Sequence, residues 1–215
     1  MDTHNPGYWN RVADEKEFTT SLAGERFRQL VPQEAKILDV GCGYGRTLQE
    51  LHSLGYSCLY GVDFAEKMIE RGRKNLPFLS LQVALGQKLP FPEESFDAVL
   101  LLAVLTCIPD NHEQEKLLQE IYRILKPGGI LYINDFLLNE DARNRQRYHE
   151  GVKKYGIYGL FELPEGVVLR HHEENYLREI LALFHTLEWE NVVFSTMNGH
   201  LSQGISYFGQ KTPQH

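Results

Sequence analysis

The sequence has few cysteines and no long apolar run. Its three cysteines, Cys42, Cys58 and Cys107, are odd in number and widely spaced among 215 residues, which argues against a disulfide framework or a zinc site. No run approaches the roughly 18 apolar residues of a membrane span, and the polar start MDTHNPGYWNRVADEKEF lacks the apolar region of a secretory signal. We therefore expect a cytoplasmic protein with reduced thiols and no membrane contact.

Basic clusters are missing too. The formal net charge is −7, whereas proteins that bind bulk nucleic acid usually present a basic face to the phosphates. The best local candidate, residues 143–154, interleaves bases with acids and is interpreted as a solvated helix face. We therefore expect no nucleic-acid partner. Because repeats and low-complexity linkers are also absent, a single domain is predicted over residues 1–215.

Short apolar runs alternate with amphipathic segments in the first two thirds of the chain. Strands are predicted at residues 35–40, 57–62, 79–85, 96–105 and 130–136, and helices at residues 46–54, 65–75 and 111–125. This alternation predicts an α/β protein with a parallel sheet and helices on both faces.

The alternation breaks after Phe136. A charged helix is predicted at residues 139–155, irregular chain at 156–170, a helix at 174–184, and strands at 189–196 and 204–209. The stretch 137–170 is too long for an ordinary connector, so we expect a lid over a bound molecule, with a plain surface hairpin as the alternative. The last strands either complete the sheet or meet another subunit, so the oligomeric state stays open.

The most informative stretch is ILDVGCGYG at residues 37–45. Three glycines at alternate positions follow a strand that ends in an acid, and they let the backbone approach a ligand closely. A dinucleotide-binding GxGxxG loop would need glycine at the position of Arg46. A nicotinamide enzyme is therefore the weaker hypothesis, and a tight turn without a ligand is a further alternative.

A second acid, Asp63, ends the next predicted strand. It would lie at the carboxyl edge of the sheet beside the glycine loop, where a carboxylate can accept hydrogen bonds from two ribose hydroxyls. Capping of the helix at residues 65–75 is the alternative role, and the two roles are compatible.

Four motifs, ILDVGCGYGRTL, GVDFAEKMIE, LPFPEESFDAVLLLAVL and ILKPGGILYINDF, resemble in order and spacing those of class I S-adenosylmethionine-dependent methyltransferases of the small-molecule, methyltransferase type 11-like kind. The resemblance runs from about residue 8 to the end of the sequence. It implies a Rossmann-like, doubly wound, seven-stranded and mostly parallel sheet with a helical lid insertion at about residues 137–170. It also implies S-adenosylmethionine as cofactor, S-adenosylhomocysteine as product and a small-molecule methyl acceptor.

The resemblance also assigns roles to individual residues. Gly41, Cys42 and Gly43 would pass the methionine part of the cofactor, in a loop shaped by Asp39 and Gly45. Asp63 would bind the ribose, Phe64 and Met68 would pack near the adenine, Gly86 and Gln87 would approach the adenine edge, and Ala103 would flank the transferred methyl. An N-terminal segment of about residues 1–33, with Tyr8 and Trp9, would cap the cofactor. Relatives often have an acid where this sequence has Leu85, so adenine recognition falls here to Gln87 or to backbone groups.

Methyl transfer from a sulfonium leaves no obligatory catalytic residue to search for. Holding nucleophile, methyl and sulfur in line can contribute roughly 7–11 kcal/mol, and a base is needed only for an acceptor that starts protonated with a high pKa. His171, as a base or a hydrogen-bond donor, and Asp135 are the candidate catalytic residues. Candidate acceptor contacts are Trp9, Tyr8, Thr106 and Tyr148.

A metal site could be drawn around His171 and His172, with Glu173, Glu174 and His149 nearby. Adjacent side chains of an extended segment point to opposite faces, so we expect no metal. Two other functions stay open: a methyltransferase that acts on protein or nucleic acid, and a non-catalytic S-adenosylmethionine sensor or partner subunit. Against a nucleic-acid methylase, the Asn/Asp-Pro-Pro-aromatic motif and the Pro-Cys nucleophile are both absent.

Overall fold

The computed structural model describes residues 6–84, 88–196 and 199–212. Within these residues seven strands form one sheet in the order β3-β2-β1-β4-β5-β9-β8. The strands are β1 (Ile37–Val40), β2 (Leu59–Asp63), β3 (Ser80–Val83), β4 (Phe96–Leu102), β5 (Leu125–Phe136), β8 (His185–Ser195) and β9 (Leu201–Gln210). Strands β1 to β5 are parallel, and β9 runs antiparallel to both β5 and β8. The predicted Rossmann-like fold is confirmed.

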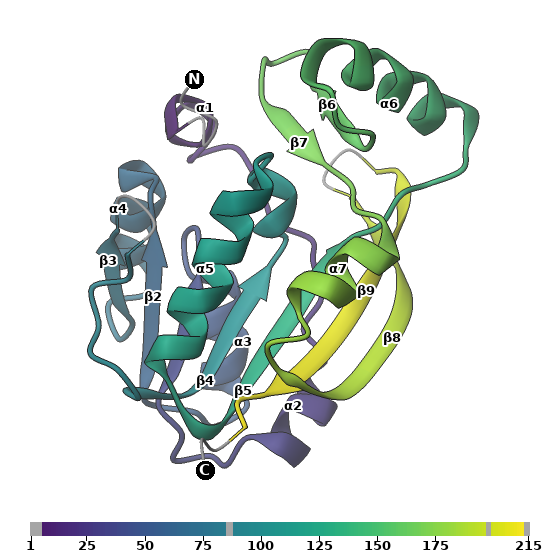
Figure 1. Ribbon diagram of the computed structural model, residues 1–215. Helices are drawn as coiled ribbons and strands as arrows, with labels where there is room; N and C mark the ends of the chain where they lie inside the picture. Colours follow the sequence, from purple (N-terminus) through teal and green to yellow (C-terminus); the bar gives the residue numbers. More distant parts are fainter. Residues whose placement is uncertain (1–5, 85–87, 197–198, 213–215) are drawn as a thin grey trace.

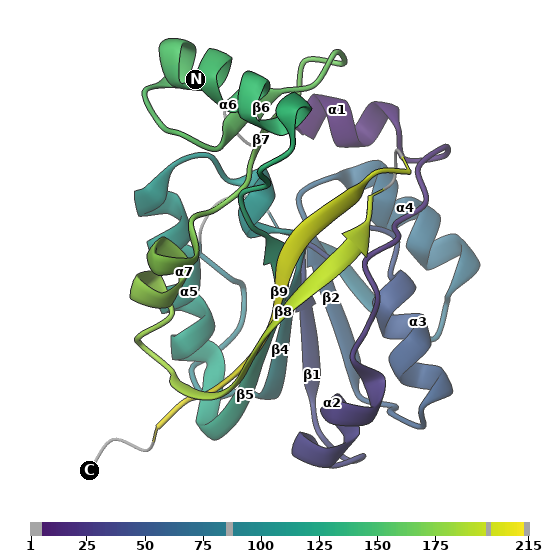
Figure 2. The same cartoon turned by 90° about the vertical axis from the view of Figure 1, so that its right-hand side faces the viewer.

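Helices cover both faces of this sheet (Figure 1, Figure 2). On one face lie α2 (Gly24–Leu30), α3 (Arg46–Ser53) and α4 (Glu66–Asn75), and on the other lie α5 (Asn111–Ile124) and α7 (Glu174–Ile180). Each side has its own apolar core: Phe27, Leu48 and Ile69 belong to the first, and Leu118 and Leu177 to the second. The central strands are therefore buried on both faces, which explains their almost continuous apolar sequence.

The C-terminal strands complete the sheet. Strand β9 pairs with β5 from Ile130 opposite Gln210 to Phe136 opposite Gly204, and β8 forms the outer edge. The sequence prediction placed the start of the strand at residue 189, whereas β8 begins at His185. Its first two residues, His185 and Thr186, are polar and exposed, as suits an edge strand, so they carry no apolar signal. The preceding helix, expected to reach residue 184, ends at Ile180.

The long insertion after β5 folds as a helix and a small hairpin. Helix α6 (Ala142–Tyr155) is followed by β6 (Leu160–Glu162) and β7 (Val168–Arg170), which pair antiparallel. The prediction of an irregular chain at residues 156–170 was therefore wrong, because three-residue strands are too short to show alternation. Figure 1 shows this insertion above the carboxyl ends of the parallel strands.

The N-terminal segment reaches the same edge of the sheet. Helix α1 (Pro6–Arg11) lies near α4, and the turn after it is held by Arg71, whose guanidinium donates to the carbonyls of Ala13 at 2.9 Å and Lys16 at 3.0 Å. The short 3-10 helix η1 (Leu105–Cys107) follows β4 directly. None of the helices in the described ranges is long and apolar enough to cross a membrane.

Candidate active site

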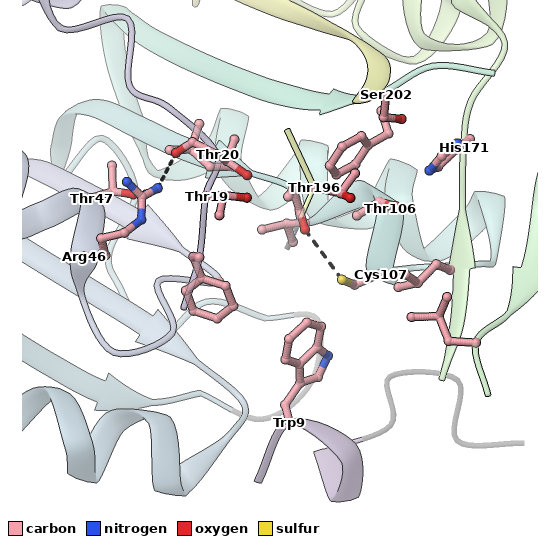
Figure 3. Close-up of a pocket in the computed structure, with 18 of the residues that line it drawn as sticks. Trp9, Thr19, Thr20, Arg46, Thr47, Thr106, Cys107, His171, Thr196 and Ser202 are labelled. Atoms are coloured by element: carbon pink, nitrogen blue, oxygen red, sulfur yellow. Dashed lines mark hydrogen bonds between the residues drawn. The ribbon is translucent and has the colours of Figure 1, made fainter. Parts of the chain in front are cut away.

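A cavity lies at the carboxyl edge of the parallel strands, between the glycine loop, the N-terminal segment and the insertion. Figure 3 shows Arg46, Thr47 and Thr20 at one end of it, and His171 and Ser202 at the other. Many of the residues proposed from the sequence line this cavity: Trp9, Asp39, Gly41, Cys42, Asp63, Phe64, Met68, Ala103, Thr106 and His171. The structure therefore joins the glycine loop and the insertion in one site.

The glycine loop has a backbone that larger residues would not fit. Gly41, Gly43 and Gly45 have φ of 73°, 54° and 89°, in the left-handed region that favours glycine. A Cβ on Gly41 would lie 2.5 Å from Cγ2 of Val104, and one on Gly43 would lie 2.3 Å from Cε2 of Phe18. Gly43 and Gly45 are not among the lining residues; Gly45 is the N-cap of α3. Close approach to a ligand thus falls to Gly41 and Cys42.

Asp63 ties the glycine loop to the end of β2. Its Oδ2 accepts from the Gly43 N–H and its Oδ1 from the Ala65 N–H, each at 2.8 Å. Burial raises the pKa of the Asp63 carboxyl, and these backbone N–H groups oppose the rise. Because each carboxylate oxygen can accept a second hydrogen bond, the fixed carboxylate can serve the loop, the start of α4 and two ribose hydroxyls together.

Asp39 is the second acid of the cavity. It is only 2% exposed, and burial raises its pKa to about 8, although Arg46 opposes the rise. In an unfolded chain this pKa is about 4. Between these two values the folded state holds a proton that the unfolded state has lost, so the free energy of unfolding falls as the pH rises.

We expect Asp39→Asn to remove this pH dependence. The unfolding free energy of the variant, minus that of the wild type, should rise from pH 5 to pH 8 by up to about 1.4 kcal/mol per pH unit. Urea denaturation at each pH measures the difference. Asp97→Asn is the control, because ion pairing and hydrogen bonding lower the pKa of Asp97 despite its partial burial, and its difference should stay flat. A flat difference for Asp39→Asn would mean that Asp39 is ionised in the folded protein.

The turn after β4 is strained where the methyl is expected. Ala103 has a φ of 55°, which is uncommon for a residue with a side chain and typical of functional sites. Its N–H donates to the Asn134 carbonyl at 2.7 Å, and the Cys107 thiol donates to the Ala103 carbonyl at 3.5 Å (Figure 3). Burial raises the pKa of Cys107 far above its ordinary value, so this thiol is no nucleophile at neutral pH.

Asp135 lies behind the cavity wall and not on it. Its carboxylate accepts from the N–H groups of Thr106 at 3.2 Å and Phe136 at 2.8 Å. Burial raises its pKa to about 7 against these hydrogen bonds. Asp135 thus holds the turn that carries Thr106. A catalytic role would need contact with the acceptor, and the place of Asp135 behind the wall does not support such a contact.

The two adjacent histidines point in different directions. His171 lines the cavity and contacts Phe136 and Phe161, whereas His172 lies with its Nε2 2.9 Å from Nε2 of Gln114. In the described part of the chain, no group of three or more His, Cys, Asp or Glu side chains is arranged to hold a metal.

The remaining predicted residues differ in their placement. Trp9 lines the cavity, and Tyr8 packs edge-on behind it, with ring centroids 5.0 Å apart, but is not part of the lining. Tyr148 is fully buried behind His171 and does not line the cavity either. Gly86 and Gln87, like Leu85, lie outside the described residues.

Part of the cavity wall consists of residues that carry no signal in the sequence. They include Phe18, Thr20, Arg46, Phe136, Arg143, Arg147, Phe161, Thr196 and Ser202. The two arginines of α6 lie in the stretch interpreted as a solvated face. Arg143 is exposed and Arg147 is half-buried, and both line the cavity. Their spacing of four residues places them on one side of the helix, but only the packing of the insertion shows which side faces the cavity.

Comparison with known proteins places this geometry in a family. Residues 38–133 match the family described as "Methyltransferase domain". The 27-O-demethylrifamycin SV methyltransferase of Amycolatopsis mediterranei is 28% identical over 158 residues, which cover 70% of this chain and 57% of that protein. This chain spans about half the length of the curated relatives that it matches.

Solved structures agree with the fold. A SAM-dependent methyltransferase from Methanosarcina mazei superposes with a TM-score of 0.83 at 26% identity, covering 88% of this chain and 98% of that one. The 1,6-didemethyltoxoflavin-N1-methyltransferase of Burkholderia thailandensis, solved with S-adenosylhomocysteine, has a TM-score of 0.64 at 19% identity and covers 89% and 77%. Residues 38–133 therefore form a methyltransferase domain, and over most of its length the chain has the fold of S-adenosylmethionine-dependent methyltransferases, whose cofactor is S-adenosylmethionine.

Proposed function

We propose that this protein transfers a methyl group from S-adenosylmethionine to a small-molecule acceptor by in-line displacement. The observation that carries the proposal is the single cavity shared by the glycine loop, the strained turn after β4 and the insertion. Such a cavity holds cofactor and acceptor side by side at the edge where open α/β sheets bind ligands.

The residues present fit the cofactor. Gly41 and Cys42 bring the backbone of the glycine loop to the cavity wall, where glycine lets a ligand approach the backbone closely. The Asp63 carboxylate is fixed by backbone N–H groups and keeps acceptor capacity for two hydroxyls. When bound, S-adenosylmethionine supplies a methyl group on a positively charged sulfur, which leaves as a neutral thioether.

The protein's task is then orientation and the exclusion of water. Phe64 and Met68 offer apolar surface beside Asp63, while Trp9 and Phe18 close the cavity from the N-terminal side. From the opposite side the insertion contributes Phe161, Leu163 and Leu169. We take about residues 1–33 as a cap and about residues 137–170 as a lid on one methyltransferase domain. A chamber closed by two segments of the same chain favours a small acceptor over a macromolecule.

The acceptors named for relatives support the same class of substrate. One relative is named for a rifamycin and another for ubiquinone and menaquinone biosynthesis. A cytoplasmic location is part of the proposal, since all three cysteines are free thiols.

Transfer of labelled methyl tests this function directly. Purified protein with methyl-labelled S-adenosylmethionine and a small-molecule extract should yield a labelled product, whereas the protein fraction of the same extract should stay unlabelled. Label in protein or nucleic acid alone would overturn the small-molecule acceptor. Label in no fraction, from a protein that binds the cofactor, would favour a sensor without catalytic activity.

A further inference from the structure

We infer that the acceptor carries an anionic oxygen group, a carboxylate or a phenolate, which Arg143, Arg147 and His171 bind at the lid side of the cavity. This inference rests on the proposed function, because it names the class of molecule that the same site takes.

The acids and the lid-side cations of the cavity lie on opposite sides. Both acids among its described lining residues, Asp39 and Asp63, belong to strands β1 and β2 beside the glycine loop. The insertion contributes two cations, Arg143 and Arg147, and no carboxylate. Arg46 also lines the acid side, where it pairs with Glu50, whereas the lid side holds two cations and no acid.

The two arginines have no internal counter-ion. Neither forms an ion pair with any carboxylate in the described ranges. The acid nearest to Arg143 in sequence, Asp141, is engaged as the N-cap of α6, where it accepts from the Asn144 N–H at 3.1 Å. The acid nearest to Arg147, Glu150, accepts from Nε2 of Gln146 at 3.1 Å. Like charges one helical turn apart repel each other, and burial together with this repulsion lowers the pKa of Arg147. A bound anion would relieve both costs.

Arg147 is held ready for a planar anion. Its guanidinium carbon lies 3.5 Å from the ring centroid of Phe161, and its Nε is buried without a hydrogen-bond partner. A guanidinium stacked in this way loses little freedom when it binds a carboxylate. Phe136 and Phe161 give the adjoining wall an apolar surface, which suits an aromatic or aliphatic body.

His171 adds a donor, and its neighbours determine which ring nitrogen carries the proton. Asn139 has a fixed amide orientation, because its Oδ1 accepts from the Gln203 N–H at 2.8 Å and its Nδ2 donates to the Leu137 carbonyl at 2.8 Å. This Nδ2 lies 3.3 Å from Nδ1 of His171. This Nδ2 also donates to Oγ of Ser202 at 3.0 Å, so both of its protons are engaged. Because an NH₂ group cannot accept, its approach to Nδ1 disfavours a proton on Nδ1.

The Tyr148 hydroxyl agrees with this assignment. It lies 2.6 Å from Nδ1 of His171 and accepts from the Asn139 N–H at 3.3 Å, so its own proton is free to point at Nδ1. Burial lowers the pKa of His171 well below its ordinary value, so the ring is neutral. The proton of a neutral ring then sits on Nε2. His171 is 6% exposed, its Nε2 has no partner among the described residues, and its ring points into the cavity (Figure 3).

His171 is therefore a hydrogen-bond donor to the acceptor and not a base. Two guanidinium groups and one N–H that face the same space, without an opposing carboxylate, form a site for an anionic oxygen group.

A matched pair of ligands tests this site. Trans-cinnamate and cinnamamide share an apolar body and differ in charge, and each is titrated into protein saturated with S-adenosylhomocysteine. We expect cinnamate to bind at least about tenfold more tightly than cinnamamide, since charge-assisted hydrogen bonds are the stronger ones. The preference should disappear in the Arg143→Gln/Arg147→Gln double variant and shrink in each single variant. Arg145→Gln is the control, because Arg145 is exposed on the same helix and does not line the cavity.

Every outcome decides for or against the inference. Equal binding of the two ligands, binding of neither at millimolar concentration, or a preference that survives the double variant would overturn it. The affinity for S-adenosylhomocysteine, measured in the same samples, should be equal in all variants. If the wild-type protein does not bind S-adenosylhomocysteine, this result would count against the proposed function and not against the anion site.

Discussion

Asp63→Ala is expected to weaken S-adenosylhomocysteine binding by at least about 100-fold, because hydrogen bonds to a charged group contribute about 1.5–3 kcal/mol each. The variant loses the proposed acceptor of two ribose hydroxyls. It also frees the N–H groups of Gly43 and Ala65, each 2.8 Å from the carboxylate, so the glycine loop loses its anchor. Isothermal titration calorimetry measures the change.

Two further variants separate binding from folding. Asp63→Asn keeps one acceptor oxygen and should show an intermediate loss. Asp97→Ala removes another strand acid, which pairs with Lys126 at 2.7 Å but does not line the cavity, and it should leave the affinity unchanged. Affinity within about threefold of wild type for a folded Asp63→Ala protein, less than about 0.7 kcal/mol, would contradict the assignment of Asp63.

The second large effect is expected at Gly151, where α6 packs on β6. A Cβ at this position would lie 1.7 Å from the carbonyl oxygen of Leu160, so Gly151→Ala must push the two elements of the lid apart. Overpacking of this kind costs about 1–3 kcal/mol, or roughly 2–12 °C in Tm for a chain of this size. Methyl transfer should fall at least about tenfold through lost orientation of the acceptor.

Cofactor binding should survive the same change, since Asp63 and Gly41 lie on the other side of the cavity. Val152→Ala is the matched control, because Val152 is the next residue of α6 and 37% exposed; its Tm and turnover should stay close to wild type. Thermal melts and turnover assays on both variants test the proposal that residues 137–170 act as a lid. Unchanged turnover in Gly151→Ala would refute it.

The sequence predicted the sheet because its signals are local. Each buried strand is an apolar run. The glycine loop is marked in the sequence by three glycines at alternate positions, and in the structure all three have positive φ. Asp63 could be placed beside that loop because parallel strands end at one edge. The hairpin of β6 and β7 was not predicted from the sequence, because its strands have only three residues each.

The acceptor side could not be predicted in the same way, because it is assembled from distant segments. Thr196 reaches the cavity directly after β8 and Ser202 from the start of β9, and no local pattern marks them. The charges of α6 suggested a solvated face, and only packing against Phe161 turns Arg147 inward. For His171, the sequence left open a base or a donor. The choice depends on Asn139 and Tyr148, which are 32 and 23 residues away in the chain.

Calorimetric titration of the wild-type protein shows whether this cavity binds S-adenosylmethionine for methyl transfer. The cavity architecture predicts micromolar binding of S-adenosylmethionine and S-adenosylhomocysteine at one site per chain, and no binding of NADH. Binding of NADH, or binding of neither sulfur compound to a folded protein, would rule out a methyltransferase site here and assign the glycine loop to another ligand.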